Sequence, residues 1–140
     1  MMFLSEYLKV LFDKTEGKAP ALDRKNEKQV QEFCLELIKK GLIQSAHDCS
    51  EGGLAIAVAE SCFAAPEEPL GAKLELESSL RRDTLLFGES QSRIVISFPE
   101  ELTDQIKNLA LSYNVDFSLI GITGGSKFTV SINGQEYINQ

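Results

Sequence analysis

Two short stretches hold most of the polar side chains that could do chemistry in this sequence. The first, residues 45–63 (SAHDCSEGGLAIAVAESCF), sets the only histidine, an aspartate, a serine, a glutamate and two adjacent glycines before a long apolar run. The second, residues 85–98 (LLFGESQSRIVISF), sets a glycine, a carboxylate and several hydrogen-bond donors between an apolar run and a β-branched run. Each pattern is compatible with binding a small ligand.

The first stretch has the general plan of an anion cradle. A strand ending at His47 and Asp48 would be followed by Gly52 and Gly53 at the start of a helix, where backbone N–H groups and the helix dipole favour a phosphate. Asp48 could hold Mg²⁺ against that phosphate, because Mg²⁺ prefers carboxylate and phosphate oxygens. The spacing alone favours a plainer interpretation, in which Asp48 or Ser50 caps the helix and the glycines allow close packing. His47 is interpreted as a hydrogen-bonded structural residue.

The second stretch is equally open to two interpretations. Gly88 predicts an unusual turn, Ser90, Gln91 and Arg93 offer donors, and Glu89 offers a carboxylate for a ligand. Alternatively, the segment is a polar strand entrance with Arg93 paired to Glu89 on the surface. The sequence contains no GxSxG elbow, Walker loop or HExxH motif, so it assigns no catalytic residue.

Composition narrows the function classes. A chain of 140 residues with 43% hydrophobic and 25% charged residues predicts a single globular domain. The net charge is −7 and lysine and arginine never cluster beyond a pair, which argues against a nucleic-acid partner. No apolar run approaches the ~18 residues that a membrane span needs.

Targeting and redox signals point to the cytoplasm. The first residues, MMFLSEYLKVLFDK, carry Glu6 and Lys9 within their apolar pattern, which is not typical of a signal peptide. The three cysteines are an odd number without CxxC spacing, which argues against a disulfide framework and against a structural zinc site.

Hydrophobic periodicity predicts an α+β domain. Helices are expected at residues 2–14, 23–40, 54–65 and 100–113, the second capped by Asp23 and stopped by Gly41. The helix at 54–65 is expected to be buried on most sides, so that Ile56→Asp should unfold the chain. Loops are expected at 16–23 and 65–72.

The expected strands have three kinds of pattern. Residues 72–77 alternate with period two, residues 93–98 and 117–122 resemble central strands, and residues 42–47 form a short strand. Residues 127–138 predict a hairpin that turns at Asn133 and Gly134. The order of elements predicts a mixed β-sheet flanked by helices.

Both polar stretches together resemble one family. The strings SAHDCSEGGLAIAVAE and LFGESQSRIVISF, with SEYLKVLFDKTEGKAPALD before them and FSLIGITGGSKFTV after them, are similar to the C-terminal region of phosphoribosylformylglycinamidine synthase, large subunit. The resemblance covers nearly the whole chain. It implies one domain over residues 1–140 of the aminoimidazole ribonucleotide (AIR) synthase C-terminal type, with partial ferredoxin-like similarity. This domain would be the second copy in the synthase, and residues 1–22 would be a helical lead-in and linker.

The resemblance also implies a reaction. The family uses ATP and Mg²⁺ to convert formylglycinamide ribonucleotide into its amidine in purine biosynthesis, with ammonia that a glutaminase subunit supplies in the split bacterial form, alongside a small bridging subunit. The ATP-binding halves would lie outside this chain, so the isolated domain is expected to be inactive and to have no certain cofactor of its own. By matching motifs, Glu89, Ser90 and Gln91 are expected to contact substrate and Asp48 to bind metal, while the cradle pattern itself places Gly52 and Gly53 at a phosphate.

Two alternatives remain at this stage. The chain could be a freestanding, non-catalytic ligand-binding or assembly module of the same fold, which an upstream ATP-binding half in the reading frame would exclude. It could also belong to a related kinase of the synthetase superfamily, although the string GESQSR argues against that class.

Overall fold

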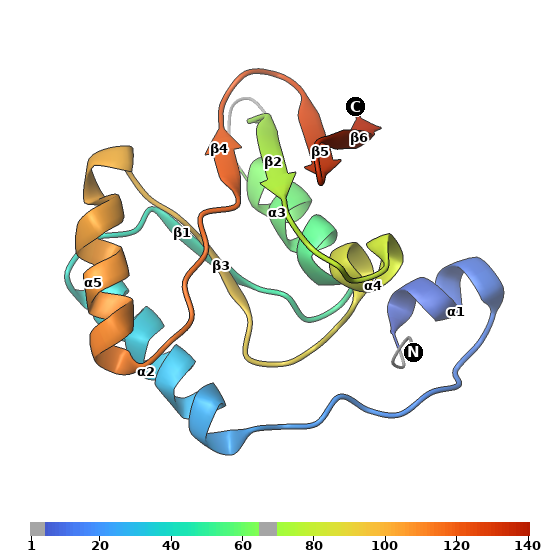
Figure 1. The fold of residues 1–140 in the computed structure, drawn as a ribbon, viewed down its shortest axis with the longest axis horizontal. Coiled ribbons are helices and arrows are strands. Elements are labelled where there is room, and N and C mark those ends of the chain that lie inside the picture. Colours follow the sequence, from blue (N-terminus) through green and yellow to red (C-terminus); the bar gives the residue numbers. More distant parts are fainter. Residues whose placement is uncertain (1–4, 65–69) are drawn as a thin grey trace.

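The computed structural model describes residues 5–64 and 70–140 of the chain, and these ranges contain helices packed against two short sheets (Figure 1). The helices are α1 (Glu6–Phe12), α2 (Arg24–Lys39), α3 (Gly53–Phe63), α4 (Arg82–Phe87), the 3₁₀ turn η1 (Glu100–Leu102) and α5 (Thr103–Tyr113). The strands are β1 (Ser45–Asp48), β2 (Ala72–Leu76), β3 (Ile94–Ser97), β4 (Gly121–Thr123), β5 (Phe128–Ile132) and β6 (Gln135–Asn139). No helix within these ranges has both the length and the apolar character needed to cross a bilayer.

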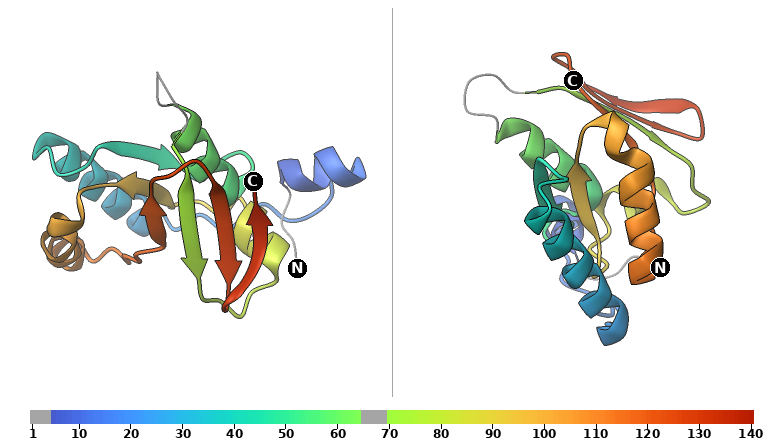
Figure 2. Two further views of the ribbon diagram at one scale, coloured as in Figure 1. Left: turned by 90° about the horizontal axis from the view of Figure 1, so that it is seen from above. Right: turned by 90° about the vertical axis from the view of Figure 1, so that its left-hand side faces the viewer.

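The larger sheet is mixed, as predicted. Its four strands run in the order β4-β2-β5-β6, in which β2 and β5 pair parallel while the two outer pairings are antiparallel (Figure 2). Side chains of β2 alternate between buried and exposed, because one face of the sheet carries the core and the other faces solvent.

The hairpin at the end of the sheet forms at the predicted turn. Asn133 and Gly134 both adopt positive φ angles, of 51° and 78°, as a tight two-residue connection between β5 and β6 requires. The Asn133 side chain also accepts from the Ser78 N–H at 3.0 Å and donates to the Ser78 carbonyl at 2.9 Å. The turn is therefore tied to the segment that leaves β2.

Helices α3 and α4 cover the inner face of the larger sheet. One core cluster gathers the buried side chains of α3, α4, β2 and β5: Ala55, Val58, Cys62, Ala72, Leu74, Leu76, Leu86, Val130 and Ile132. Burial of this apolar surface supplies most of the driving force for holding the helices on the sheet.

A second cluster lies where α2 and α5 meet the two-stranded sheet. Its buried members are Phe33, Leu37, Leu42, Ile106 and Ala110. The Asp23 carboxylate caps α2 as predicted, accepting from the N–H groups of Lys25 and Asn26 at 3.0 and 3.1 Å. Gly41 follows the helix with a φ of +64°.

Several expectations about strands and helices were wrong. The β-branched run at 93–98 forms β3, which pairs only with β1 in a separate two-stranded sheet, and the run at 117–122 contributes only to β4 at the sheet edge. A high strand propensity indicates that the side chains suit a half-buried pleated surface. It does not indicate whether the strand lies at the centre or at the edge of a sheet. The sequence also did not predict α4, whose six residues are too few to show a helical period.

Helix α3 is less buried than its composition suggested. Five of its residues are buried, but Ile56 and Phe63 are 39% and 69% exposed, so the prediction that the helix is buried on most sides is wrong at these two positions. Ala55, Val58 and Cys62 pack in the cluster with the sheet and Ala57 is also buried, whereas Ile56 and Phe63 are exposed. Most of the loop expected at 65–72 lies outside the described residues.

Candidate functional site

The two polar stretches meet in the fold. Strands β1 and β3 pair antiparallel with Asp48 opposite Ile94, and the Cys49 N–H donates to the Arg93 carbonyl at 3.0 Å. The residues that follow β1 and those that precede β3 therefore lie at the same edge. The sequence could predict this meeting only on the condition that the two strands are neighbours.

The Glu89 carboxylate joins three segments at that edge. Its Oε1 atom accepts from the Gly52 N–H at 2.9 Å and from the Glu6 N–H at 2.8 Å. Both donors belong to the first turns of helices, α3 and α1, where backbone N–H groups lack partners within the helix. A negative charge is also favoured there by the helix dipole. The anion at the start of α3 is thus the chain's own side chain.

The two glycines are required by close packing. Both have positive φ angles, +80° at Gly52 and +73° at Gly53. A Cβ atom on Gly53 would lie 2.7 Å from the Gly88 carbonyl oxygen and 2.8 Å from the Phe87 carbonyl carbon. Gly53 therefore allows α3 to approach the end of α4, which is the plainer interpretation that the sequence had left open.

The predicted caps and the predicted surface ion pair are not present in this region. Neither Asp48 nor Ser50 caps α3, because the N-cap position is Gly52 and its N–H binds Glu89. Arg93 does not pair with Glu89. Its guanidinium donates to the Gly88 carbonyl through Nη2 and to the Ser90 carbonyl through Nε at 3.4 Å, which fixes the turn from inside.

Two further residues hold this turn and were not singled out by the sequence. Ser92 has a φ of 63°, and its hydroxyl donates to Glu27 on α2 at 2.6 Å. The partners of Ser92 and Glu89 are 65 and 83 residues away in the chain, so no local pattern could reveal them. Ser90 is half-buried and Gln91 is exposed, and within the described ranges neither side chain has a hydrogen-bond partner in the protein.

Asp48 does not lie in a metal-binding arrangement. Its side chain is 70% exposed, and the described residues contain no group of three or more side chains placed to hold a metal ion. The neighbouring His47 donates from Nδ1 to the Asp48 carbonyl oxygen at 2.7 Å, and its Nε2 lies 3.1 Å from a carboxylate oxygen of Glu60. The donor set therefore does not fit a resident Mg²⁺, and His47 has the structural contacts that the sequence suggested.

Cys49 is not an activated nucleophile. Burial raises the pKa of its thiol, Arg93 opposes that rise, and Asp48 adds to it. The pKa lies above its ordinary value, so the thiol stays protonated near neutral pH. The site thus contains a closed structural turn with Ser90 and Gln91 at its surface.

Comparison with known protein families identifies the domain. The family model described as AIR synthase related protein, C-terminal domain, matches residues 3–133. The chain belongs to this family. The AIR synthase related C-terminal domain fits the mixed sheet flanked by helices that the structure contains.

Relatives of this AIR synthase related domain include subunits of one enzyme. The phosphoribosylformylglycinamidine synthase subunit PurL of Moorella thermoacetica is 47% identical over 135 residues, and that of Caldanaerobacter subterraneus is 42% identical. Each match covers 96% of this chain and 18% of the relative. The chain therefore spans less than a fifth of the length of these curated relatives.

Solved structures share the fold. Phosphoribosylformylglycinamidine synthase II of Thermotoga maritima superposes with a TM-score of 0.79 at 21% identity, covering 91% of this chain and 22% of that one. The T. maritima PurL complexed with ATP gives a TM-score of 0.75, covering 85% of this chain and 21% of that one at the same identity. At this level of identity the likeness concerns the fold alone.

Proposed function

We propose that the chain is the second AIR synthase related C-terminal domain of a phosphoribosylformylglycinamidine synthase, and that it acts in the assembled enzyme as a supporting domain. The observation that carries this proposal is the Glu89 carboxylate, which accepts from the Gly52 and Glu6 N–H groups. A carboxylate already held by two backbone donors stabilises the fold and leaves no open cradle for a substrate phosphate. The 47% identity across the chain supports the assignment to this enzyme.

The reaction of the whole enzyme would be the ATP-dependent amidation of formylglycinamide ribonucleotide. Phosphoryl transfer depends on groups that cradle phosphates, hold metal ions and orient the nucleophile. At the Glu89 turn, the described residues offer only Ser90 and Gln91 as free polar contacts, because Glu89, Gly52 and Gly53 have structural partners. ATP and Mg²⁺ would therefore be bound by other domains, and the 140-residue chain by itself would be inactive.

The partners would be the other domains of the same enzyme, with a glutaminase and a small bridging subunit. Support comes from a T. maritima structure titled PurLQS, which gives a TM-score of 0.76 and covers 99% of this chain and 24% of that one at 19% identity. A cytoplasmic location stays a prediction.

A domain replacement tests the proposal. The segment of the M. thermoacetica subunit that matches this chain is replaced by residues 1–140, and phosphate release is measured with ATP, formylglycinamide ribonucleotide and ammonium. We expect turnover within about tenfold of the parent subunit, because a supporting domain must supply shape and contacts but no reacting group. The isolated chain assayed alone should release no phosphate above background.

Two outcomes would contradict the proposal. A well-folded replacement protein that lacks activity would favour the freestanding-module alternative. Substrate-dependent turnover by the isolated chain would show that it carries catalytic groups of its own.

A further inference from the structure

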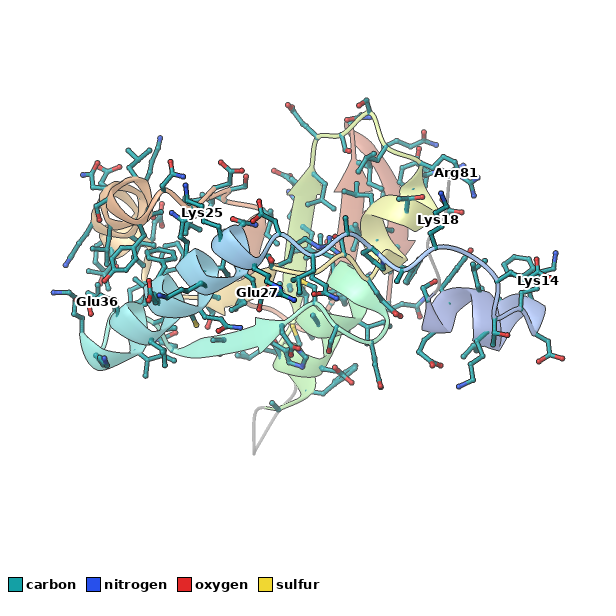
Figure 3. All side chains as sticks on the ribbon, turned by 90° about the horizontal axis from the view of Figure 1, so that it is seen from below. Lys14, Lys18, Lys25, Glu27, Glu36 and Arg81 are labelled. Carbon is teal, nitrogen blue, oxygen red and sulfur yellow. The ribbon has the colours of Figure 1, made fainter. Side chains whose placement is uncertain are left out.

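A second polar region lies beside the Glu89 turn, in a cleft between α1 and α4. Its volume is about 390 Å³, and it is lined by Tyr7, Arg81, Arg82, Asp83, Leu86 and Phe87. This volume falls within the range of small-molecule sites, roughly 300–1,000 Å³. Figure 3 shows Arg81 at the α4 end of the molecule, with Lys18 at the same end.

One part of the cleft is aromatic. Tyr7 on α1 stacks on Phe87 of α4, with the ring centroids 4.9 Å apart and the planes within 8° of each other. Leu86 beside them is only 4% exposed. This arrangement gives a rigid apolar surface on which a flat group can pack at low entropic cost.

The two arginines of the cleft differ in their contacts. Arg81 forms a two-pronged pair with Asp83, with Nε 3.1 Å from Oδ1 and Nη2 against Oδ2, and this pair holds the pKa of Asp83 below its ordinary value. The charges of Arg81 and Asp83 therefore largely offset each other at neutral pH.

Arg82 keeps its charge available. Its guanidinium carbon lies 4.4 Å from the centre of the Tyr137 ring, which fixes its orientation by a cation–π contact. Across residues 5–64 and 70–140, Arg82 makes no ion pair and no side-chain hydrogen bond, and the Tyr7 hydroxyl likewise has no hydrogen-bond partner. A guanidinium held flat on a ring still presents its N–H edge to an anion.

We propose that the α1–α4 cleft binds a phosphate monoester that carries an aromatic group. The planar fork of Arg82 matches two phosphate oxygens, and the Tyr7 hydroxyl is available as a second donor. The stacked Tyr7 and Phe87 rings provide the apolar contact for the rest of the ligand. On a chain of net charge −7, a free guanidinium beside a neutralised Asp83 is a local site of favourable potential for an anion. This inference is independent of the proposed enzyme activity.

The test is a calorimetric titration of the 140-residue chain with three probes: phenyl phosphate, inorganic phosphate and phenol. We expect phenyl phosphate to bind most tightly, because it alone uses both the guanidinium and the rings. Arg82→Gln should weaken phenyl phosphate binding at least about tenfold, since it removes the charged fork. The affinity of Arg82→Lys for phenyl phosphate should lie between those of the wild type and Arg82→Gln, because lysine keeps the charge but lacks the planar guanidinium fork.

Controls make the outcome decisive. Arg24→Gln removes the same charge from the first residue of α2, on a different part of the fold, and should leave the affinity unchanged. Thermal melting of each variant checks that it is folded. No heat with phenyl phosphate at millimolar concentration, or equal affinity in the wild type and a folded Arg82→Gln variant, would overturn the proposal. Equal affinity for inorganic phosphate and phenyl phosphate would overturn its aromatic part.

Discussion

The turn at Glu89 and the cleft beside Arg82 are both polar regions that touch α1, yet they use their polar groups in opposite ways. At the turn, the Glu89 carboxylate and the Arg93 guanidinium bind backbone groups of the chain itself. In the cleft, the Arg82 guanidinium is oriented by a ring and has no anionic partner in the described ranges. The polar groups of the motif at Glu89 are thus bound within the chain, whereas Arg82 in the cleft has free donors.

The largest expected loss of stability follows from a charge placed in the core between α3 and the larger sheet. Val58 on α3 is 5% exposed, whereas Ile56 on the same helix is 39% exposed. Val58→Asp would bury an unpaired charge and should cost about 4 kcal/mol or more, enough to unfold a domain of this size. Ile56→Asp should cost only about 1 kcal/mol because its carboxylate can reach water.

Urea unfolding followed by circular dichroism measures both variants. A cooperative transition for Ile56→Asp and none for Val58→Asp is the expected result. The opposite ranking would mean that the outer side of α3 is the one that is packed.

The glycine at the turn should be the next most sensitive position. Gly53→Ala would force a Cβ against the Phe87 and Gly88 backbone and strain a φ of +73°, at a cost of about 3 kcal/mol. Gly41→Ala is the matched control, because its φ of +64° is similar and no atom lies within 4 Å of the new Cβ. That control should lose about 1 kcal/mol in the same urea experiment. Equal losses at both positions would show that crowding at the turn is unimportant.

Loss of the shared carboxylate should have a smaller effect. Glu89→Ala leaves the Gly52 and Glu6 N–H groups without their acceptor and should lower the free energy of unfolding by about 2 kcal/mol. Glu77→Ala, at an exposed position, should change it by less than about 0.5 kcal/mol. Amide hydrogen exchange should also speed up at α1 in the Glu89 variant. Unchanged exchange at α1 would contradict a role for Glu89 in holding that helix.

The smallest effect is expected from the paired charges in the cleft, and it depends on pH. Arg81 lowers the pKa of Asp83 in the folded chain, whereas the unfolded chain should titrate near about 3.9. The stabilisation is therefore fully present above that value and is lost as the pH falls through the lower folded pKa.

Asp83→Asn should accordingly differ from the wild type in urea midpoint at pH 6 and converge with it as the pH falls below the folded pKa of Asp83. Asp116→Asn, at an exposed position, is the control and should show no such convergence. A constant difference across the pH range would mean that the effect of Asp83 does not come from its charge.

Local signals predicted the parts of the fold that local physics decides. The Asp23 cap, the Gly41 stop and the Asn133–Gly134 turn each act within a few residues, and all are present. The period-two pattern of β2 also predicted its two faces correctly. In each case the residue type provides a hydrogen bond or a backbone conformation that the adjacent residues of the chain need.

The site could be predicted only in part, because its decisive contacts are distant in sequence. The pattern singled out Gly52, Gly53 and Glu89 as ligand contacts, which stays a prediction, and it could not reveal that Glu89 accepts from the Gly52 and Glu6 N–H groups. It also gave no sign of the cleft, which depends on α4 and on the packing of α1 against it. A glutamate in a motif looks the same in the sequence whether its carboxylate binds a ligand or backbone N–H groups of the protein.

The parallel pairing of β2 with β5 has a consequence for the order of folding. Strand β2, Ala72–Leu76, is flanked by β4 and β5, which begin only at Gly121 and Phe128. During synthesis β2 leaves the ribosome long before its partner strands β4 and β5 do. About fifty further residues must be added, at ~5–20 residues per second, before β2 can pair with them. Such non-local pairing slows folding, so the rate at which this domain matures is governed by its last strands.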